Sequence, residues 1–245
     1  MGVDLSAVDR LMPKAVRHFW KARTIAAVSQ KNRGVADQGN RSGVTAGKNL
    51  DGFVAMVREI IVSNGISKTD IYTSGRADVT IPGFYRPTKN WDLLVVSGSR
   101  LIAAVEFKSQ VGPSFGNNFN NRVEEALGNA ADLNTAVREG VFGESAKPFL
   151  GYFFVLEQCP KSTMPVRFTS PHFPAMPEFE NTSYAVRYEI LCRKLVQERL
   201  YDAAALVLTT RRADKTGEFR TASELTSPRA FAATLAGKIA AMAAR

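Results

Sequence analysis

Two apolar runs around a short turn constrain the fold of this chain more than any other feature. The runs are Leu93–Val96 and Leu101–Val105, and the segment Ser97-Gly98-Ser99-Arg100 separates them. Strand-like runs around a short turn that contains Gly predict a β-hairpin. Asp92 stands at the start of the first run, and Glu106-Phe107-Lys108 ends the second. Antiparallel pairing brings the start of one strand beside the end of the other, so charged groups should gather at one end of the hairpin.

The charged end of this hairpin has a chemical interpretation. Side chains alternate along a strand, so Glu106 and Lys108 share a face and Phe107 points to the other. Paired carboxylates bind Mg²⁺, which makes a bound water more acidic and neutralises charge developing on a phosphodiester. Asp92, Glu106 and Lys108 are therefore candidate catalytic residues, with the two acids as metal ligands. The alternative is that the acids are strand-end charges in solvent and that Lys108 is their salt-bridge partner.

The charge of the chain is positive and unevenly distributed. The net charge is +9, and nine Lys or Arg against one acid lie between Arg10 and Lys48. A concentrated basic segment is typical of proteins that bind nucleic acid. A basic face that only improves solubility is the alternative. The candidate DNA-binding residues lie in two polar segments and are Lys31, Arg33, Arg41, Lys48, Arg211 and Arg212.

Length and composition indicate one globular domain. Hydrophobic residues make up 45% of the 245 residues, enough for a single domain over residues 1–245 with a sizeable core. The basic region 1–48 is expected to be a subregion that contacts DNA. No apolar run approaches the length of a membrane span, and the N-terminus lacks the apolar run of a signal peptide, so a cytoplasmic protein without membrane contact is expected.

The hydrophobic pattern predicts an α/β fold in which helices flank a mixed central sheet. Helical periodicity, broken or restarted at Pro13 in the first case, predicts helices over 4–28, 49–64, 119–139, 182–199 and from 228 onward. Apolar runs predict strands over 71–82, 149–156 and 203–209 in addition to the hairpin. Polar or Pro-rich composition predicts loops over 30–48, 157–181 and 211–220.

These features together resemble a known family. A D-x13-E-F-K motif at the end of a hairpin, followed by a helix and a buried strand, is similar to the core of the PD-(D/E)xK nucleases. More narrowly, the chain resembles the XhoI-type type II restriction endonucleases. The segments that carry this resemblance are W-D-L-L-V-V at 91–96, A-A-V-E-F-K-S-Q-V-G-P-S-F-G-N-N-F-N-N-R at 103–122 and R-Y-E-I-L-C at 187–192.

The resemblance implies a Mg²⁺-dependent enzyme that cuts both strands of a palindromic duplex, CTCGAG, as a homodimer. It implies that Asp92 and Glu106 hold the metal and that Lys108 assists the attacking water. It further implies a prokaryotic cytoplasmic protein whose cognate modification methyltransferase is a functional rather than a physical partner. No Pro directly precedes Asp92, and Asp78 is a less well-spaced alternative for the first acid.

Two other classes of function stay open at this point. One is a repair or junction-processing nuclease on the same core, without strict sequence specificity. The other is a non-catalytic DNA-binding protein in which the acidic and basic cluster is incidental.

Overall fold

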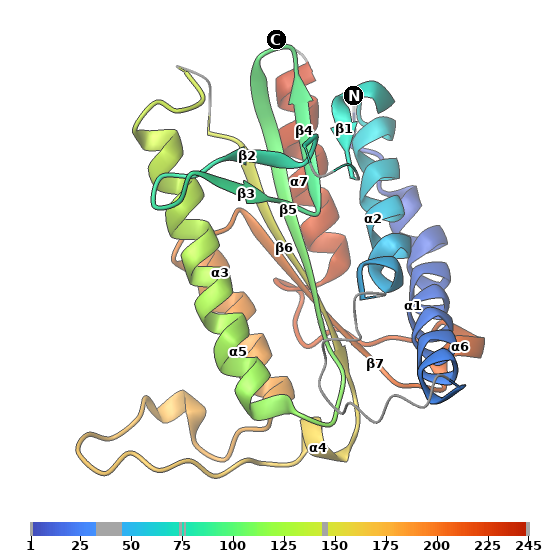
Figure 1. Cartoon of the computed structure of the whole chain (residues 1–245), viewed down its shortest axis with the longest axis vertical. Helices are drawn as coiled ribbons and strands as arrows, with labels where there is room; N and C mark the ends of the chain where they lie inside the picture. Colours follow the sequence, from blue (N-terminus) through green and yellow to red (C-terminus); the bar gives the residue numbers. More distant parts are fainter. Residues whose placement is uncertain (1, 33–45, 74, 76, 144–146, 244–245) are drawn as a thin grey trace.

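A five-stranded mixed sheet forms the centre of the molecule in the computed structural model, which describes residues 2–32, 46–73, 75, 77–143 and 147–243 (Figure 1). Its strand order is β1-β4-β5-β6-β7; the pairs β1–β4 and β4–β5 are antiparallel, and the pairs β5–β6 and β6–β7 are parallel. The strands are β1 Ile71–Tyr72, β4 Leu93–Ser97, β5 Arg100–Gln110, β6 Phe149–Glu157 and β7 Ala203–Thr209. A separate two-stranded sheet pairs β2 Thr80–Pro82 with β3 Thr88–Asn90.

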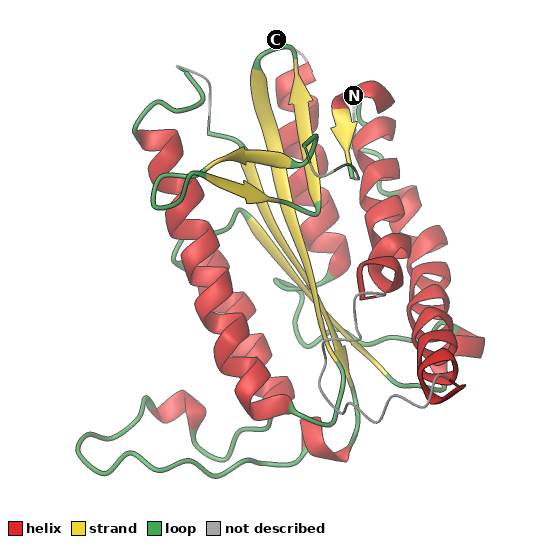
Figure 2. Ribbon diagram, in the orientation of Figure 1, coloured by secondary structure: helices red, strands yellow, loops and turns green. Residues whose placement is uncertain are grey.

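Helices cover both faces of the central sheet (Figure 2). One face packs against α1 Ser6–Asn32, α2 Ala46–Ser63 and α7 Pro228–Ala243. The opposite face packs against α3 Phe115–Arg138 and α5 Tyr184–Gln197. The shorter helices are α4 Pro160–Thr163, α6 Ala213–Thr216 and the 3₁₀ turns η2 Lys68–Asp70 and η3 Pro177–Phe179. This architecture confirms the predicted α/β fold with a mixed central sheet.

The β6 strand joins the two cores because all of its residues are buried. Alternate side chains of a strand point to opposite faces. Phe153 therefore belongs to the core beneath α1, α2 and α7, whereas Tyr152 and Phe154 belong to the core beneath α3 and α5. A continuous apolar run is the pattern of a strand covered on both faces, which confirms the prediction of a buried central strand here.

The predicted hairpin is confirmed by β4 and β5. Leu93 pairs with Val105, and the register shifts by a bulge between Val95 and Val96. Past Glu106, β5 continues to Gln110 paired only with β6 among the described strands. The edge of β5 opposite β6 is therefore free of a strand at the charged end of the hairpin.

Other predicted elements are correct in type but differ in extent. The strand over 203–209 and the helix from Pro228 are confirmed, and the helices over 49–64 and 182–199 are confirmed within three residues. The helix predicted from 119 begins instead at Phe115, and Ser114 rather than Asn118 stands at its N-cap position, without a side-chain capping hydrogen bond.

Pro13 does not interrupt the first helix, contrary to the prediction. The α1 helix continues through it, although Pro has no N–H to donate to the carbonyl of Asp9. The side chains of Met12 and Val16 on either side are fully buried. The buried face of α1 thus outweighs the lost hydrogen bond.

The strand predicted over 71–82 is wrong as a single element. Its ends belong to different sheets, β1 and β2, and a turn lies between them. Gly75 has a φ of +85° in that turn, a backbone conformation that ends a strand. The loop predicted over 30–48 is also shorter than expected, because α1 extends to Asn32 and α2 begins at Ala46; the remainder lies outside the described residues.

The segment between α4 and α5 extends away from the body of the molecule (Figure 1). It carries large apolar side chains in solvent, namely Met164, Phe168, Phe173 and Met176. The predicted loop over 157–181 is therefore confirmed in its main part, with α4 and η3 as single short turns. None of the helices in the described part of the chain is long and apolar enough to cross a membrane.

Substitution of Phe153 by Ala tests the role of β6 in joining the two layers. Its ring is fully buried and lies 5.4 Å from the Phe53 ring and 5.5 Å from the Phe107 and Phe231 rings. We expect Phe153→Ala to lower the free energy of unfolding by about 3–5 kcal/mol in urea denaturation. The control is Ile25→Ala at a side chain that is 66% exposed, which should change stability by no more than about 0.5 kcal/mol. Equal effects of the two substitutions would contradict this description of the core.

Candidate active site

Asp92 lies directly before β4, where it faces the free edge of β5. Its Oδ2 accepts a hydrogen bond from the backbone N–H of Phe107 at 2.7 Å. The Asp92 side chain thus supplies the acceptor that the backbone of a longer β4 strand would otherwise offer to this N–H group. The antiparallel register places this carboxylate beside Glu106, as the hairpin predicted.

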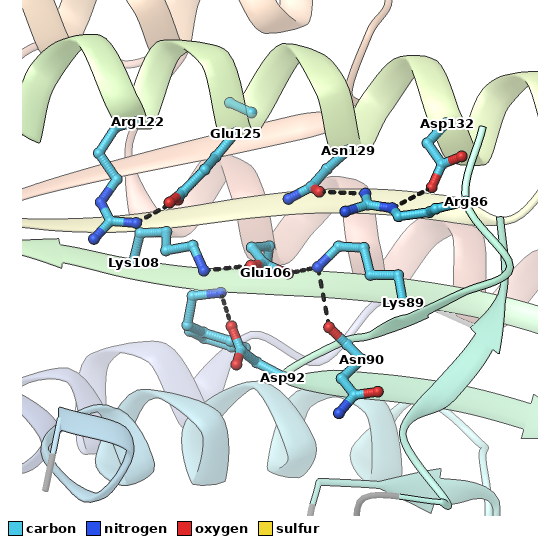
Figure 3. A network of polar contacts seen from close by, with 12 residues as sticks. Arg86, Lys89, Asn90, Asp92, Glu106, Lys108, Arg122, Glu125, Asn129 and Asp132 are labelled. Atoms are coloured by element: carbon cyan, nitrogen blue, oxygen red, sulfur yellow. Dashed lines mark hydrogen bonds and ion pairs between the residues drawn. The ribbon is translucent and has the colours of Figure 1, made fainter. Parts of the chain in front are cut away.

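Glu106 is buried between two lysine ammonium groups (Figure 3). Its Oε1 lies 2.5 Å from Lys108 Nζ, and its Oε2 lies 2.8 Å from Lys89 Nζ. Glu106 is only 3% exposed, so the interpretation of the acids as strand-end charges in solvent is wrong for this residue. A buried carboxylate is normally paired, and here each of its oxygens has its own cation.

Lys89 is the residue of this cluster that the sequence did not identify. It lies on β3, and its Nζ also donates to the Asn90 carbonyl at 3.0 Å. The ammonium lies 4.4 Å from the centre of the Trp91 ring, a cation–π contact. The signal in the sequence was a Lys next to the hairpin with an aromatic residue two positions later, which is too common to have singled it out.

The charges of the cluster shift one another's pKa values. Burial alone would raise the pKa of Glu106, but Lys108 and Lys89 outweigh it and hold the pKa below its ordinary value. Desolvation, followed by repulsion from Glu106, raises the pKa of Asp92 to about 6. Asp92 is exposed as a residue, yet its carboxylate lies against the Phe107 backbone. The cluster therefore holds Glu106 ionised and disfavours a second negative charge on Asp92.

A second polar network fixes the turn that leads into β3. Asp132 of α3 accepts hydrogen bonds from the N–H groups of Phe84 and Tyr85, both at 2.8 Å, and from Arg86 Nε at 2.7 Å. A Cβ at Gly83 would lie 2.4 Å from Asp132 Oδ2, so only glycine permits this approach. Figure 3 shows this network beside the Glu106 cluster. The turn, β3 and hence Lys89 are thereby anchored to α3.

Comparison with known proteins supplies the family. The family model for restriction endonuclease XhoI matches residues 29–221. The type II restriction enzyme XhoI of Xanthomonas vasicola is 51% identical over 196 residues, which cover 80% of this chain and 78% of that enzyme. The type II restriction enzyme BstVI of Geobacillus stearothermophilus is 49% identical over 189 residues, covering 75% of this chain and 84% of the relative. The chain belongs to the XhoI family of restriction endonucleases. A third relative, the type II restriction enzyme AbrI of Azospirillum brasilense, is 50% identical over 173 residues, which cover 71% of this chain and 77% of that enzyme. No solved structure matches the chain.

Membership of the XhoI family decides between the classes of function that the sequence left open. The chain is a site-specific nuclease, a hydrolase that acts on double-stranded DNA as its partner. The interpretations as a non-catalytic DNA-binding protein and as a nuclease without sequence specificity are not supported. The Asp92, Glu106 and Lys108 cluster lies within the part of the chain that the family model matches.

Among the predicted DNA-binding residues, only Arg211 and Arg212 have described side chains. Arg33 and Arg41 lie outside the described residues, and only the backbone of Lys31 and Lys48 is described, in α1 and α2. Arg211 and Arg212 are both exposed, and Arg211 is also bound through its Nε to Glu157 Oε1 at 2.6 Å. The basic segment 10–48 also turns one side chain inward, because Arg23 donates to Ser109 Oγ at 3.0 Å on β5. Not every positive charge of that segment is therefore free for DNA.

Asp78, the alternative candidate for the first acid, lies in different surroundings from Asp92. Asp78 is exposed in the turn between β1 and β2, whereas Asp92 lines a cavity of about 370 Å³. The cavity lies between α2 and the start of β4, and Asp51, Arg58 and Thr73 are among its lining residues. The geometry thus favours Asp92 over Asp78 as the acid that accompanies Glu106.

The donor set of this cluster suits a hard divalent cation. Structural metal sites made only of protein ligands use about four side chains, and no group of three or more His, Cys, Asp or Glu gathers at one place within the described residues. Mg²⁺ differs in that one or two carboxylates suffice, with waters and substrate phosphate completing its shell. Asp92 and Glu106 meet that requirement, and a cation between them would relieve their mutual repulsion, which adds to desolvation in raising the pKa of Asp92.

The raised pKa of Asp92 makes a prediction for the protein free of divalent cations. Because the folded-state pKa of about 6 lies above the ordinary value of 3.8, the folded chain binds this proton more tightly than the unfolded chain does. The free energy of unfolding therefore falls as pH rises through that window. Relative to Asp92→Asn, the wild type should lose stability between about pH 4 and pH 7 in urea denaturation with EDTA. A difference that does not change with pH would contradict the assignment.

Proposed function

We propose that this enzyme hydrolyses both strands of the palindromic duplex CTCGAG in a Mg²⁺-dependent reaction. The observation that carries the catalytic assignment is the buried Glu106 with Lys108 Nζ 2.5 Å away, beside Asp92 at the free edge of β5. The CTCGAG site rests on the resemblance to XhoI-type enzymes. The Mg²⁺ requirement rests on the oxygen donors of the two carboxylates.

Each residue of the proposed site has a distinct role. Asp92 and Glu106 would hold the cation, which when bound neutralises charge on the scissile phosphate and makes water more acidic. Lys108 is 24% exposed at its side chain, so its ammonium can reach the substrate. Burial would lower the pKa of Lys108, but Glu106 and Asp92 raise it above its ordinary value. Lys108 therefore stays protonated, and we assign it to orienting the attacking water and stabilising the anionic transition state rather than to accepting a proton.

A plasmid digest with matched variants tests this assignment. We expect discrete fragments with Mg²⁺ and none with EDTA, and Asp92→Asn, Glu106→Gln and Lys108→Gln should each slow cleavage by at least about 100-fold. Isosteric amides are preferable to Ala at Glu106, because that residue is buried and its removal would leave two cations unpaired. The control is Asp78→Asn in the exposed turn, which should cleave at the wild-type rate. Wild-type cleavage by Asp92→Asn together with loss of cleavage in Asp78→Asn would reverse the assignment of the first acid.

We further propose that the active species is a two-fold symmetric homodimer. One Asp-Glu-Lys cluster per chain cuts one strand, so equivalent cuts in both strands of a palindrome are simplest with two copies around a two-fold axis. The extended segment between α4 and α5 supports a protein contact, because Phe173 is 79% exposed and Met164 and Met176 are more than half exposed there. Exposed apolar side chains gathered on one segment are typical of interaction surfaces.

The dimer proposal is tested by stoichiometry and by mixed dimers. Sedimentation with a CTCGAG duplex should show two chains per duplex. A dimer with one Glu106→Gln chain should nick the DNA rather than cut both strands. Double-strand breaks made by a single chain in one binding event would overturn the proposal.

A further inference from the structure

Lys89 occupies the side of Glu106 that the proposed catalytic residues do not use. Its Nζ is 2.8 Å from Glu106 Oε2, whereas Lys108 Nζ is 2.5 Å from Oε1. We propose that the Lys89 ammonium group takes the place of a second divalent cation, so that each chain binds one cation at Asp92 and Glu106. This inference rests on the proposed Mg²⁺-dependent cleavage and concerns the number of cations, which that proposal leaves open.

Three contacts hold the Lys89 ammonium in position. They are the charge-assisted hydrogen bond to Glu106, the hydrogen bond to the Asn90 carbonyl at 3.0 Å and the contact with the Trp91 ring at 4.4 Å. The side chain is 10% exposed, so little water is available to replace these partners. The strand that carries it is anchored through its turn to Asp132 of α3. Lys89 is therefore a fixed positive charge of the site.

The oxygens of the two acids leave little room for a pair of cations. Sites with two metal ions hold them about 4 Å apart, and shared carboxylate oxygens must then be available to both. Each Glu106 oxygen already accepts an ammonium group, and Asp92 Oδ2 accepts the N–H of Phe107. Asp92 Oδ1 is the one carboxylate oxygen of the pair with no hydrogen-bond donor among the described residues. One cation can bind there and displace the more exposed Lys108 from Glu106, but a second would have to displace Lys89 as well.

The two lysines differ in a way that fits this division of roles. The Lys108 side chain is 24% exposed and comes from the part of β5 whose edge is free. The Lys89 side chain is 10% exposed and lies between the Trp91 ring and Glu106. Displacing Lys89 would strip a desolvated ammonium of its carboxylate and place a divalent charge beside it, and both steps are unfavourable. Lys89 acts through Glu106 and is a positioning residue, not a catalytic one.

Calcium titration of the protein on DNA tests this inference. Ca²⁺ takes the same oxygen ligands as Mg²⁺, and it is titrated by calorimetry into EDTA-treated protein bound to a duplex that the wild type cleaves with Mg²⁺. Cleavage during the titration is excluded by gel. We expect one Ca²⁺ per wild-type chain, one in Lys89→Arg, which keeps the charge, and two in Lys89→Ala. The control is Lys147→Ala at an exposed position, which should also bind one.

The outcomes separate this inference from the function on which it rests. Two Ca²⁺ per wild-type chain, or the same number in Lys89→Ala as in the wild type, would overturn the role of Lys89. If Lys89→Ala does not fold, the wild-type titration still decides. A second readout is the Mg²⁺ dependence of cleavage, whose Hill coefficient should be close to one in the wild type and close to two in Lys89→Ala. Absence of any cleavage by the wild type would instead contradict the proposed function itself.

Discussion

A buried carboxylate between two ammonium groups is the interaction on which the rest of this structure depends. Glu106 lies on the longest strand of the sheet and is almost inaccessible to solvent. An isolated charge at that depth would cost several kcal/mol or more. Lys108 and Lys89 remove that cost, and they come from opposite directions, one along the same strand and one from a separate small sheet. The fold has to bring β3 across the end of the hairpin for the charge to be stable.

The surrounding elements achieve this by fixing the turn before β3. Asp132 collects two backbone N–H groups and a guanidinium on a single carboxylate. Burial alone would raise the pKa of Asp132, but Arg86 and the two N–H groups outweigh it and hold the pKa below the ordinary value. The second buried acid thus stays ionised like the first. Two polar networks, both based on a buried carboxylate, connect α3, the small sheet and β5.

The sequence predicted the hairpin and its charged end because those features are local. Apolar runs, a Gly-containing turn and alternation of side chains suffice to place Asp92 beside Glu106, and the buried strands follow from equally local patterns. Lys89 could not be found in this way, since its partner is 17 residues away and the two meet only through the path of a separate sheet. Pro13 is the opposite case, in which a local rule predicted a helix break and the buried side chains Met12 and Val16 prevailed. The split of residues 71–82 between two sheets is likewise a tertiary outcome that periodicity does not encode.

The cluster around Glu106 contains two carboxylates and two ammonium groups, so its charges cancel when Asp92 is ionised. The net charge of +9 must therefore reside elsewhere on the chain. Long-range attraction of a polyanion depends on that distant excess and is screened by salt over roughly 10 Å at 0.1 M. Capture of the duplex and the cleavage proposed for the Glu106 cluster thus draw on different charges, and ionic strength acts on the encounter while leaving the buried cluster largely unaffected.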